Sequence, residues 1–304
     1  MKIIATAVVV SIVGIGILLG LRELRRYIPK KPGLVRQITT ARIDINRPPW
    51  MPVELAGEIA RQIGPIPGSR LSRLDLAKEV YERAVAHPMI RSLKPVVRMQ
   101  TDDPRVDRIV VRCEFRQPIA KVAAAGGYAI VDAEGVRLPA KMAPMWVRPD
   151  GSDGRREYFL DTPNQPTSDS RRVHYVLIQG VRAQLPPVGK SWLGDDLRDA
   201  IRLTRMIYAK TWANEITVIN VENHNSRLSR TEPEIVMHAQ NGWSRPTVIK
   251  FGRFPAADGS ELFAIPPERR MQYIDRYVSE HGGKLTGFNT YLDLRYDYLH
   301  VSID

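Results

Sequence analysis

The chain has 304 residues, with 45 Lys and Arg against 33 Asp and Glu, and a formal net charge of +12. Its single cysteine excludes a disulfide scaffold, a zinc site built from several cysteines and an iron–sulfur cluster. With 43% hydrophobic and 26% charged residues, the composition also excludes a mostly disordered or collagen-like chain, and the length suggests about two domains.

The excess positive charge is concentrated toward the N-terminus. Residues 1–33 carry a net charge of +5, residues 34–113 another +5, and residues 114–304 only +2, so ten of the twelve charges lie in the first 113 residues. This position next to an apolar segment favours anionic lipid headgroups over nucleic acid as the neighbour of the charge.

The first predicted element is a membrane anchor. Residues 3–21 include no charged side chain, and at about 1.5 Å per residue they reach roughly 28 Å, close to the thickness of the hydrocarbon core. A cleavable signal peptide is the alternative, but no small-x-small cleavage site comes after the apolar run. The sequence therefore predicts a transmembrane anchor and basic linker over residues 1–33. The basic flank favours a cytoplasmic location for the domains beyond the anchor, although long domains translocate regardless of flanking charge.

Residues 34–113 predict a small β-α-α-β-β domain. A strand is expected at 36–45, and a helix from 53 to 63 follows from the spacing of its apolar residues. A second helix has the apolar stripe Ala77, Val80, Tyr81 and Ala84. Strands at 93–100 and 106–117 complete the domain. Cys113 lies on the apolar face of the last strand, which indicates a small core residue.

Residues 114–304 predict a larger domain with a mixed β-sheet and helices on one face, so the expected fold class is α+β. A hairpin is expected at 128–138, and residues 148–172 predict an exposed loop. The other expected elements are helices starting at Asp195 or Asp196 and at 267–280, and strands near 215–222, 234–240, 246–252, 289–296 and 298–303. In the first of the last two strands, Leu292, Leu294 and Tyr296 alternate with Asp293 and Arg295.

The sequence contains no pattern typical of catalysis. None of the six histidines falls at the H-x-x-x-H spacing of a zinc site, and neither a phosphate-binding loop nor a nucleophile elbow is present. We therefore expect a non-enzymatic binding protein without cofactor, metal or small-molecule substrate.

The last predicted strand offers a specific mode of binding. With Asp304 as the last residue, we expect no later strand to cover the strand at 298–303, and a free strand edge can pair with a strand from a partner. The alternative, in which this strand lies inside the sheet, is equally compatible with the sequence.

Four segments in chain order resemble the bacterial cell-division protein family FtsQ, also called DivIB. Residues 87–90, His-Pro-Met-Ile, resemble the end of a helix in that family, and residues 115–120, Phe-Arg-Gln-Pro-Ile-Ala, resemble a junction motif in which Glu is usual at the Phe position. Residues 130–136 resemble a family hairpin, and residues 291–297, Tyr-Leu-Asp-Leu-Arg-Tyr-Asp, a strand near the family's end.

The resemblance implies a membrane helix, a POTRA domain over 34–113 and a β-domain over 114–304, on the periplasmic side of the cytoplasmic membrane at the division septum. It implies a non-enzymatic scaffold that binds small bitopic proteins similar to FtsB and FtsL and helps to control septal peptidoglycan synthesis. The partner-binding residues it implies are Arg295, Tyr296, Tyr298, Leu299, His300, Val301 and Ile303. The alternative function is a POTRA-bearing component of an envelope transport or secretion assembly.

Overall fold

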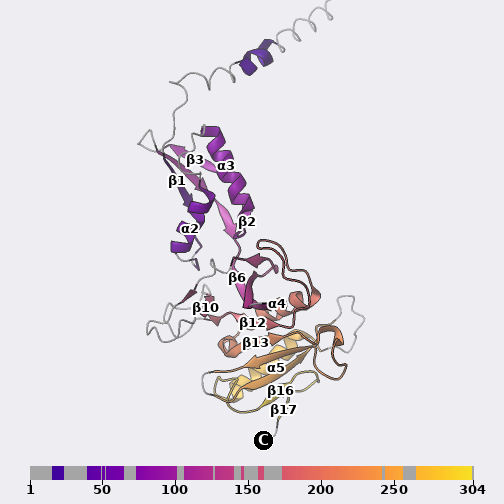
Figure 1. Cartoon of the computed structure of the whole chain (residues 1–304). Coiled ribbons are helices and arrows are strands. Elements are labelled where there is room, and N and C mark those ends of the chain that lie inside the picture. Colours follow the sequence, from indigo (N-terminus) through magenta and orange to yellow (C-terminus); the bar gives the residue numbers. More distant parts are fainter. Residues whose placement is uncertain are drawn as a thin grey trace, which may run out of the picture. The chain divides into compact units, whose positions relative to one another are not determined.

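The structure is a computed structural model that describes residues 16–23, 40–48, 50–51, 53–64, 73–100, 106–125, 127–139, 145–146, 157–160, 173–241, 244–255 and 265–302. The chain divides into two compact units (Figure 1). The first comprises Met1–Asn46, Gly57–Ala86 and Leu93–Cys113, and the second comprises Arg47–Ala56, His87–Ser92 and Glu114–Asp304.

The first unit contains a three-stranded sheet in the order β1-β4-β3. Strand β1 (Thr40–Ile45) runs parallel to β4 (Val106–Val111), and β3 (Val97–Gln100) runs antiparallel to it. The predicted strand at 93–100 is divided into β2 (Ile90–Leu93) and β3, because Pro95 between them has no backbone N–H to donate. The predicted strand at 106–117 is likewise divided, since β4 pairs with β1 and β3 whereas β5 (Cys113–Phe115) pairs with β2.

Two helices accompany this sheet, α2 (Val53–Ile63) and α3 (Arg73–Ala86). Helix α3 buries Leu76, Val80 and Ala84, whereas Tyr81 is exposed. The predicted stripe of α3 is confirmed at Val80 and Ala84 and was wrong at Tyr81. The buried row starts at Leu76, because residues four apart lie on the same face of a helix. Cys113 is buried, and burial raises the pKa of its thiol to about 11, as expected for a core cysteine.

The structure corrects the predicted fold class at its N-terminal element. No helix in the described ranges is long and apolar enough to cross a membrane, so the prediction of a single transmembrane helix is wrong for this part of the chain. Of the anchor and basic linker predicted over 1–33, residues 16–23 lie in a short helix, and residues 1–15 and 24–33 lie outside the described residues.

The second unit is built on a nine-stranded sheet in the order β17-β16-β15-β14-β13-β12-β6-β7-β8. Its strands are β6 (Pro118–Ala124), β7 (Gly127–Asp132), β8 (Arg137–Leu138), β12 (Val176–Gln179), β13 (Ile216–Asn220), β14 (Ile235–Ala239), β15 (Thr247–Gly252), β16 (Tyr291–Asp293) and β17 (His300–Val301). The neighbouring pairs β6–β12, β12–β13 and β15–β16 are parallel, and the other neighbours are antiparallel.

Helices α4 (Asp195–Tyr208) and α5 (Pro267–Glu280) connect parallel neighbours of this sheet. Helix α4 follows β12 and precedes β13, and α5 follows β15 and precedes β16. Both crossovers move in the same direction along the sheet between strands of the same orientation, so the right-handed rule places both helices on one face. Alternate burial along β14 and β15 agrees, since Met237 and Ile249 are buried whereas their neighbours are half-buried.

The segment predicted as an exposed loop at 148–172 contains a strand. Strand β10 (Glu157–Leu160) pairs antiparallel with β9 (Met145–Trp146) and β11 (Val173–His174). Tyr158, Phe159 and Leu160 form a short apolar run that is compatible with a strand. The sequence prediction missed it because the surrounding Asp, Ser and Gly residues are typical of a loop. The remaining residues of 148–172 lie outside the described residues.

Candidate functional site

The last described strand, β17, forms one end of the nine-stranded sheet within the described residues. It pairs with β16 on one side, with Val301 opposite Leu292 and His300 opposite Asp293. The Ser302 N–H donates to the Tyr291 carbonyl at 3.2 Å. In an antiparallel pair, hydrogen-bonded and non-hydrogen-bonded residues alternate. Val301 therefore directs its N–H and C=O away from β16, toward the edge of the sheet.

Three exposed rings lie just before and within this edge. Tyr296 is 49% exposed and Tyr298 is 61% exposed, and their ring centroids are 6.2 Å apart with planes inclined by 24°. The His300 ring lies 6.4 Å from Tyr296 and 6.3 Å from Tyr298. These residues, here called the aromatic patch, expose an apolar surface next to the outward-facing backbone of Val301.

A buried ion pair fixes the bend from which the aromatic patch extends. The Arg295 guanidinium donates to the Asp293 carboxylate from Nε at 3.0 Å and from Nη2 at 2.7 Å, and the Arg295 backbone N–H donates to the same carboxylate at 3.2 Å. Arg295 Nη1 also donates to the Thr231 carbonyl at 2.7 Å. Asp293 is 4% exposed. The Arg295 side chain therefore holds the chain in place, and its guanidinium lies over the Tyr296 ring, 5.8 Å from the ring centroid.

The pKa values of this pair follow from the same contacts. Burial raises the pKa of Asp293, but the hydrogen bonds and positive charge of Arg295, with the charge of Lys250, outweigh burial and leave the pKa below its ordinary value of 3.8. The hydrogen bond to Asp293 likewise raises the pKa of Arg295. Both groups therefore stay charged throughout the physiological range.

Helix α5 supports the bend from the other side. The Tyr273 hydroxyl donates to the Asp297 carbonyl at 2.8 Å, and Arg269 Nη2 lies 3.0 Å from the Asp297 carboxylate. The end of β17 is held by Ser302, whose Oγ accepts from the Thr290 N–H at 2.9 Å and whose carbonyl accepts from Asn289 Nδ2 at 2.6 Å. The edge is thus anchored on both sides of its outward-facing residue.

Some of the predicted site residues lie together and others serve the fold. Tyr296, Tyr298 and His300 are exposed, Leu299 and Val301 are half-buried, and Ile303 lies outside the described residues. The strand predicted at 298–303 is shorter, since only His300 and Val301 are strand within the described residues.

The predicted alternation along 292–296 was wrong at two positions. Asp293 is buried together with Leu292 and Leu294, and Tyr296 is exposed. The reason is that strand pairing ends at Asp293, where the chain bends around the Arg295 guanidinium.

Residues that sequence reasoning missed are those that support the edge: Asp293, Ser302, Tyr273 and Gly252. Gly252 has φ +90°, and a Cβ there would lie 3.1 Å from Cγ of Arg295. Only the Asp-Leu-Arg order within the motif offered a signal for Asp293, because a carboxylate two residues before an arginine suits a local ion pair. Tyr273 and Gly252 come from distant segments, and nothing in the sequence around Ser302 marks its contacts with Asn289 and Thr290.

Two of the histidines, His224 and His87, serve local structure. His224 Nε2 lies 2.9 Å from the Asp199 carboxylate, and His87 Nδ1 accepts from the Met89 N–H at 3.2 Å. In the described ranges, no group of three or more His, Cys, Asp and Glu side chains is close enough together to hold a metal ion.

Neither a scan against models of known protein families nor a search of curated proteins finds a match for this chain.

Proposed function

We propose that this chain is a non-enzymatic scaffold of bacterial cell division, similar to the FtsQ and DivIB proteins, that binds a partner by pairing with its strand at the β17 edge. The observation that carries the proposal is the outward-facing backbone of Val301 at the end of the sheet, next to the exposed aromatic patch. The resemblance of residues 291–297 to the family's C-terminal strand supports the same site.

The proposed binding follows from the chemistry of an open strand. When a partner strand lies beside β17, the Val301 N–H donates to its backbone and the Val301 C=O accepts from it. These backbone hydrogen bonds form whatever the sequence of the partner strand. Tyr296, Tyr298 and His300 then provide the selectivity, because large aromatic side chains at an interface centre dominate binding energy. We propose that the partners are small bitopic division proteins similar to FtsB and FtsL, bound at the septum during control of peptidoglycan synthesis.

The direct test replaces Val301 by proline. Proline lacks an N–H, and at this position the N–H points away from β16, so V301P removes an edge donor and leaves the β16–β17 pairing intact. We expect V301P to lose capture of an FtsB-like partner from the same cell while its urea unfolding midpoint stays within error of the parent. The matched control is V301A, which keeps the backbone N–H at this position and is expected to capture the partner as the parent does.

A second variant tests the aromatic patch. We expect Y296E to lower the affinity for the same partner by about thirtyfold or more, which is the loss typical of replacing a tyrosine at the centre of an interface. The control Y128E changes an exposed tyrosine on β7, far along the sheet order from β17. Unchanged capture by both folded V301P and folded Y296E contradicts the proposal.

A further inference from the structure

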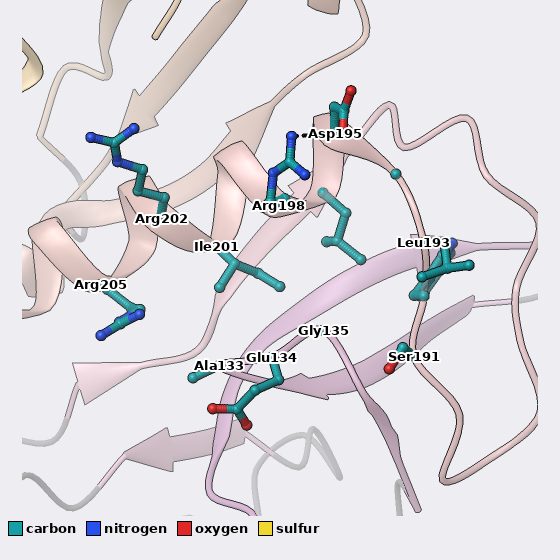
Figure 2. Close-up of a pocket in the computed structure, with 13 residues that line it drawn as sticks. Ala133, Glu134, Gly135, Ser191, Leu193, Asp195, Arg198, Ile201, Arg202 and Arg205 are labelled. Atoms are coloured by element: carbon teal, nitrogen blue, oxygen red, sulfur yellow. Dashed lines mark ion pairs between the residues drawn. The ribbon is translucent and has the colours of Figure 1, made fainter. Parts of the chain in front are cut away.

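A groove lies beside helix α4, near the end of the nine-stranded sheet opposite to β17 (Figure 2). Its volume is about 720 Å³, and its walls are α4, the turn between β7 and β8 and the segment 191–194. We call it the α4 groove. Its lining includes Glu134, Gly135, Trp192, Leu193, Ile201 and Arg205.

The centre of the α4 groove is apolar. Trp192, Leu197 and Ile201 are buried side chains of its floor, and in Figure 2 Ile201 points from α4 toward the turn at Gly135. Leu193 is 78% exposed at the far side of the groove. A leucine this exposed beside an apolar floor is suited to cover an apolar side chain of a bound molecule.

Positive charge dominates the α4 side. Arg198, Arg202 and Arg205 all line the groove, and on a helix they span about 10 Å along the axis. Arg198 is paired with Asp195 at 2.7 Å, and Arg202 lies over the Phe254 ring at 4.5 Å. Arg205 is exposed and makes no ion pair within the part of the chain that the structure describes.

The acidic residue on the opposite wall does not cancel this charge. Glu134 is paired with Arg91 at 3.0 Å and lies 3.7 Å from Arg116, which also holds Asp132 at 2.7 Å. The two acidic residues that line the groove, Glu134 and Asp195, are thus each matched by an arginine. Among the described residues, neither Arg202 nor Arg205 has an acidic partner, although the Arg202 guanidinium lies over the Phe254 ring.

The walls are held in place before anything binds. The Trp192 N–H donates to the Gly135 carbonyl at 2.8 Å, and Trp192 Nε1 donates to the Ala183 carbonyl at 2.9 Å. Asp132 Oδ1 accepts from the N–H groups of Glu134 at 3.0 Å and Val136 at 2.8 Å, which fixes the turn. A preformed groove loses less conformational entropy on binding than one that must be assembled.

From the apolar floor and the row of arginines we propose that the α4 groove binds an acidic peptide segment of a partner protein, with an apolar side chain on the floor and carboxylates against Arg202 and Arg205. A single small anion satisfies one arginine and leaves the floor uncovered, whereas a peptide engages both features. The site does not depend on the proposed function of the β17 edge, since along the sheet order the two lie on the order of 35 Å apart.

The test uses the full chain and a fluorescent peptide that has glutamates on both sides of two central leucines, with binding followed by fluorescence anisotropy. We expect R205E to lower the affinity for the peptide by about tenfold, the effect of losing one charge-assisted contact. The matched control is R276E, which makes the same charge change at an exposed position of α5. L193D tests the apolar contact and is expected to weaken binding without unfolding the protein, because Leu193 is exposed.

Two further measurements locate the site and define its chemistry. A peptide with lysines in place of the glutamates is expected not to bind, and Y296E at the β17 edge is expected to bind the acidic peptide as the parent does. Equal affinity in R205E and R276E, unchanged affinity in L193D, binding of the lysine peptide, or loss of binding in Y296E each overturns the proposal. The last result would also show that the peptide occupies the β17 edge instead.

Discussion

At the scale of single residues, Asp293 and Arg295 determine whether the aromatic patch is presented at all. The carboxylate is nearly inaccessible to solvent and accepts hydrogen bonds from the backbone N–H, Nε and Nη2 of Arg295. A buried charge that has lost its partner lowers the stability of the fold, so removal of either side chain is costly. Tyr296 comes directly after this pair, and its position depends on it.

We expect D293N to lower the free energy of unfolding by about 2 kcal/mol, the typical cost of leaving a part-buried charged group without its partner. Urea unfolding followed by circular dichroism measures the change. The control D195N breaks an exposed ion pair with Arg198, so its expected cost is below about 0.5 kcal/mol. Equal costs in the two variants contradict a structural role for the Asp293 pair.

The pH dependence of stability follows from the direction of the Asp293 pKa. Its pKa is lower in the folded chain than its ordinary value of 3.8, so its contribution is complete above 3.8 and is lost as pH falls through the lower folded value. We therefore expect the stability difference between the parent and D293N to be constant from about pH 7 to 5 and to shrink below about pH 4. A difference that persists undiminished to pH 2 contradicts the lowered pKa.

At the scale of elements, the end of β15 determines how closely Arg295 approaches the sheet. Gly252 lies at a register shift between β14 and β15 and has φ +90°, a backbone conformation that other residues rarely adopt. A Cβ there would also crowd Cγ of Arg295 at 3.1 Å. The glycine is thus required both by the backbone and by its neighbour.

We expect G252A to destabilise the protein by about 1–3 kcal/mol and to weaken partner binding at the β17 edge, because strain at Gly252 displaces Arg295. The matched control is G57A in α2, where a Cβ meets nothing within 4 Å in a helix. There alanine is expected to stabilise by about 0.5–1 kcal/mol. Thermal unfolding of both variants provides the comparison, and a neutral G252A contradicts the argument.

The sequence was informative for elements whose periodicity comes from burial on one face. The strands expected near 215–222, 234–240 and 246–252 appear within two residues of β13, β14 and β15. In β14 and in most of β15 the reason is the alternation of buried and half-buried side chains. Helix α4 begins at the expected Asp195, although its N-cap is Gly194 and the Asp196 side chain instead accepts from the Arg182 N–H and Arg227.

The site could be predicted only in part, since its geometry comes from long-range contacts. The motif at residues 291–297 pointed to the region of the β17 edge. The local alternation, however, predicted a straight strand through Tyr296, whereas the chain bends after Asp293. Support from Thr231, Tyr273 and Gly252 joins residues separated by 24 to 64 positions in the chain, and no local pattern marks such pairs. The α4 groove was missed for the same reason, because its walls come from separate elements.

At the scale of the whole second unit, the sheet has a protected middle and a short strand at each end. Ile219, Met237 and Ile249 in β13, β14 and β15 have no accessible surface, whereas β8 and β17 are each two residues long. Within the described residues β17 pairs only with β16, whereas Arg137 of β8 also exchanges backbone hydrogen bonds with Gly189 and Lys190. Local opening is easiest where buried apolar contacts are few. The two proposed binding surfaces lie near these two ends.

Amide hydrogen exchange provides a test of this arrangement. We expect peptides that contain β14 to exchange slowest, and those that contain β17 to exchange orders of magnitude faster, because an end strand that pairs on one side opens without unfolding the sheet. Addition of a partner that pairs with β17 is expected to slow exchange in the peptide that contains Val301 and to leave the β8 peptide unchanged. In Y296E, for which weak binding of the partner is expected, that protection against exchange is expected to disappear at the same partner concentration. Equal slowing at β8 and β17 indicates general stabilisation of the unit and contradicts strand pairing at the β17 edge.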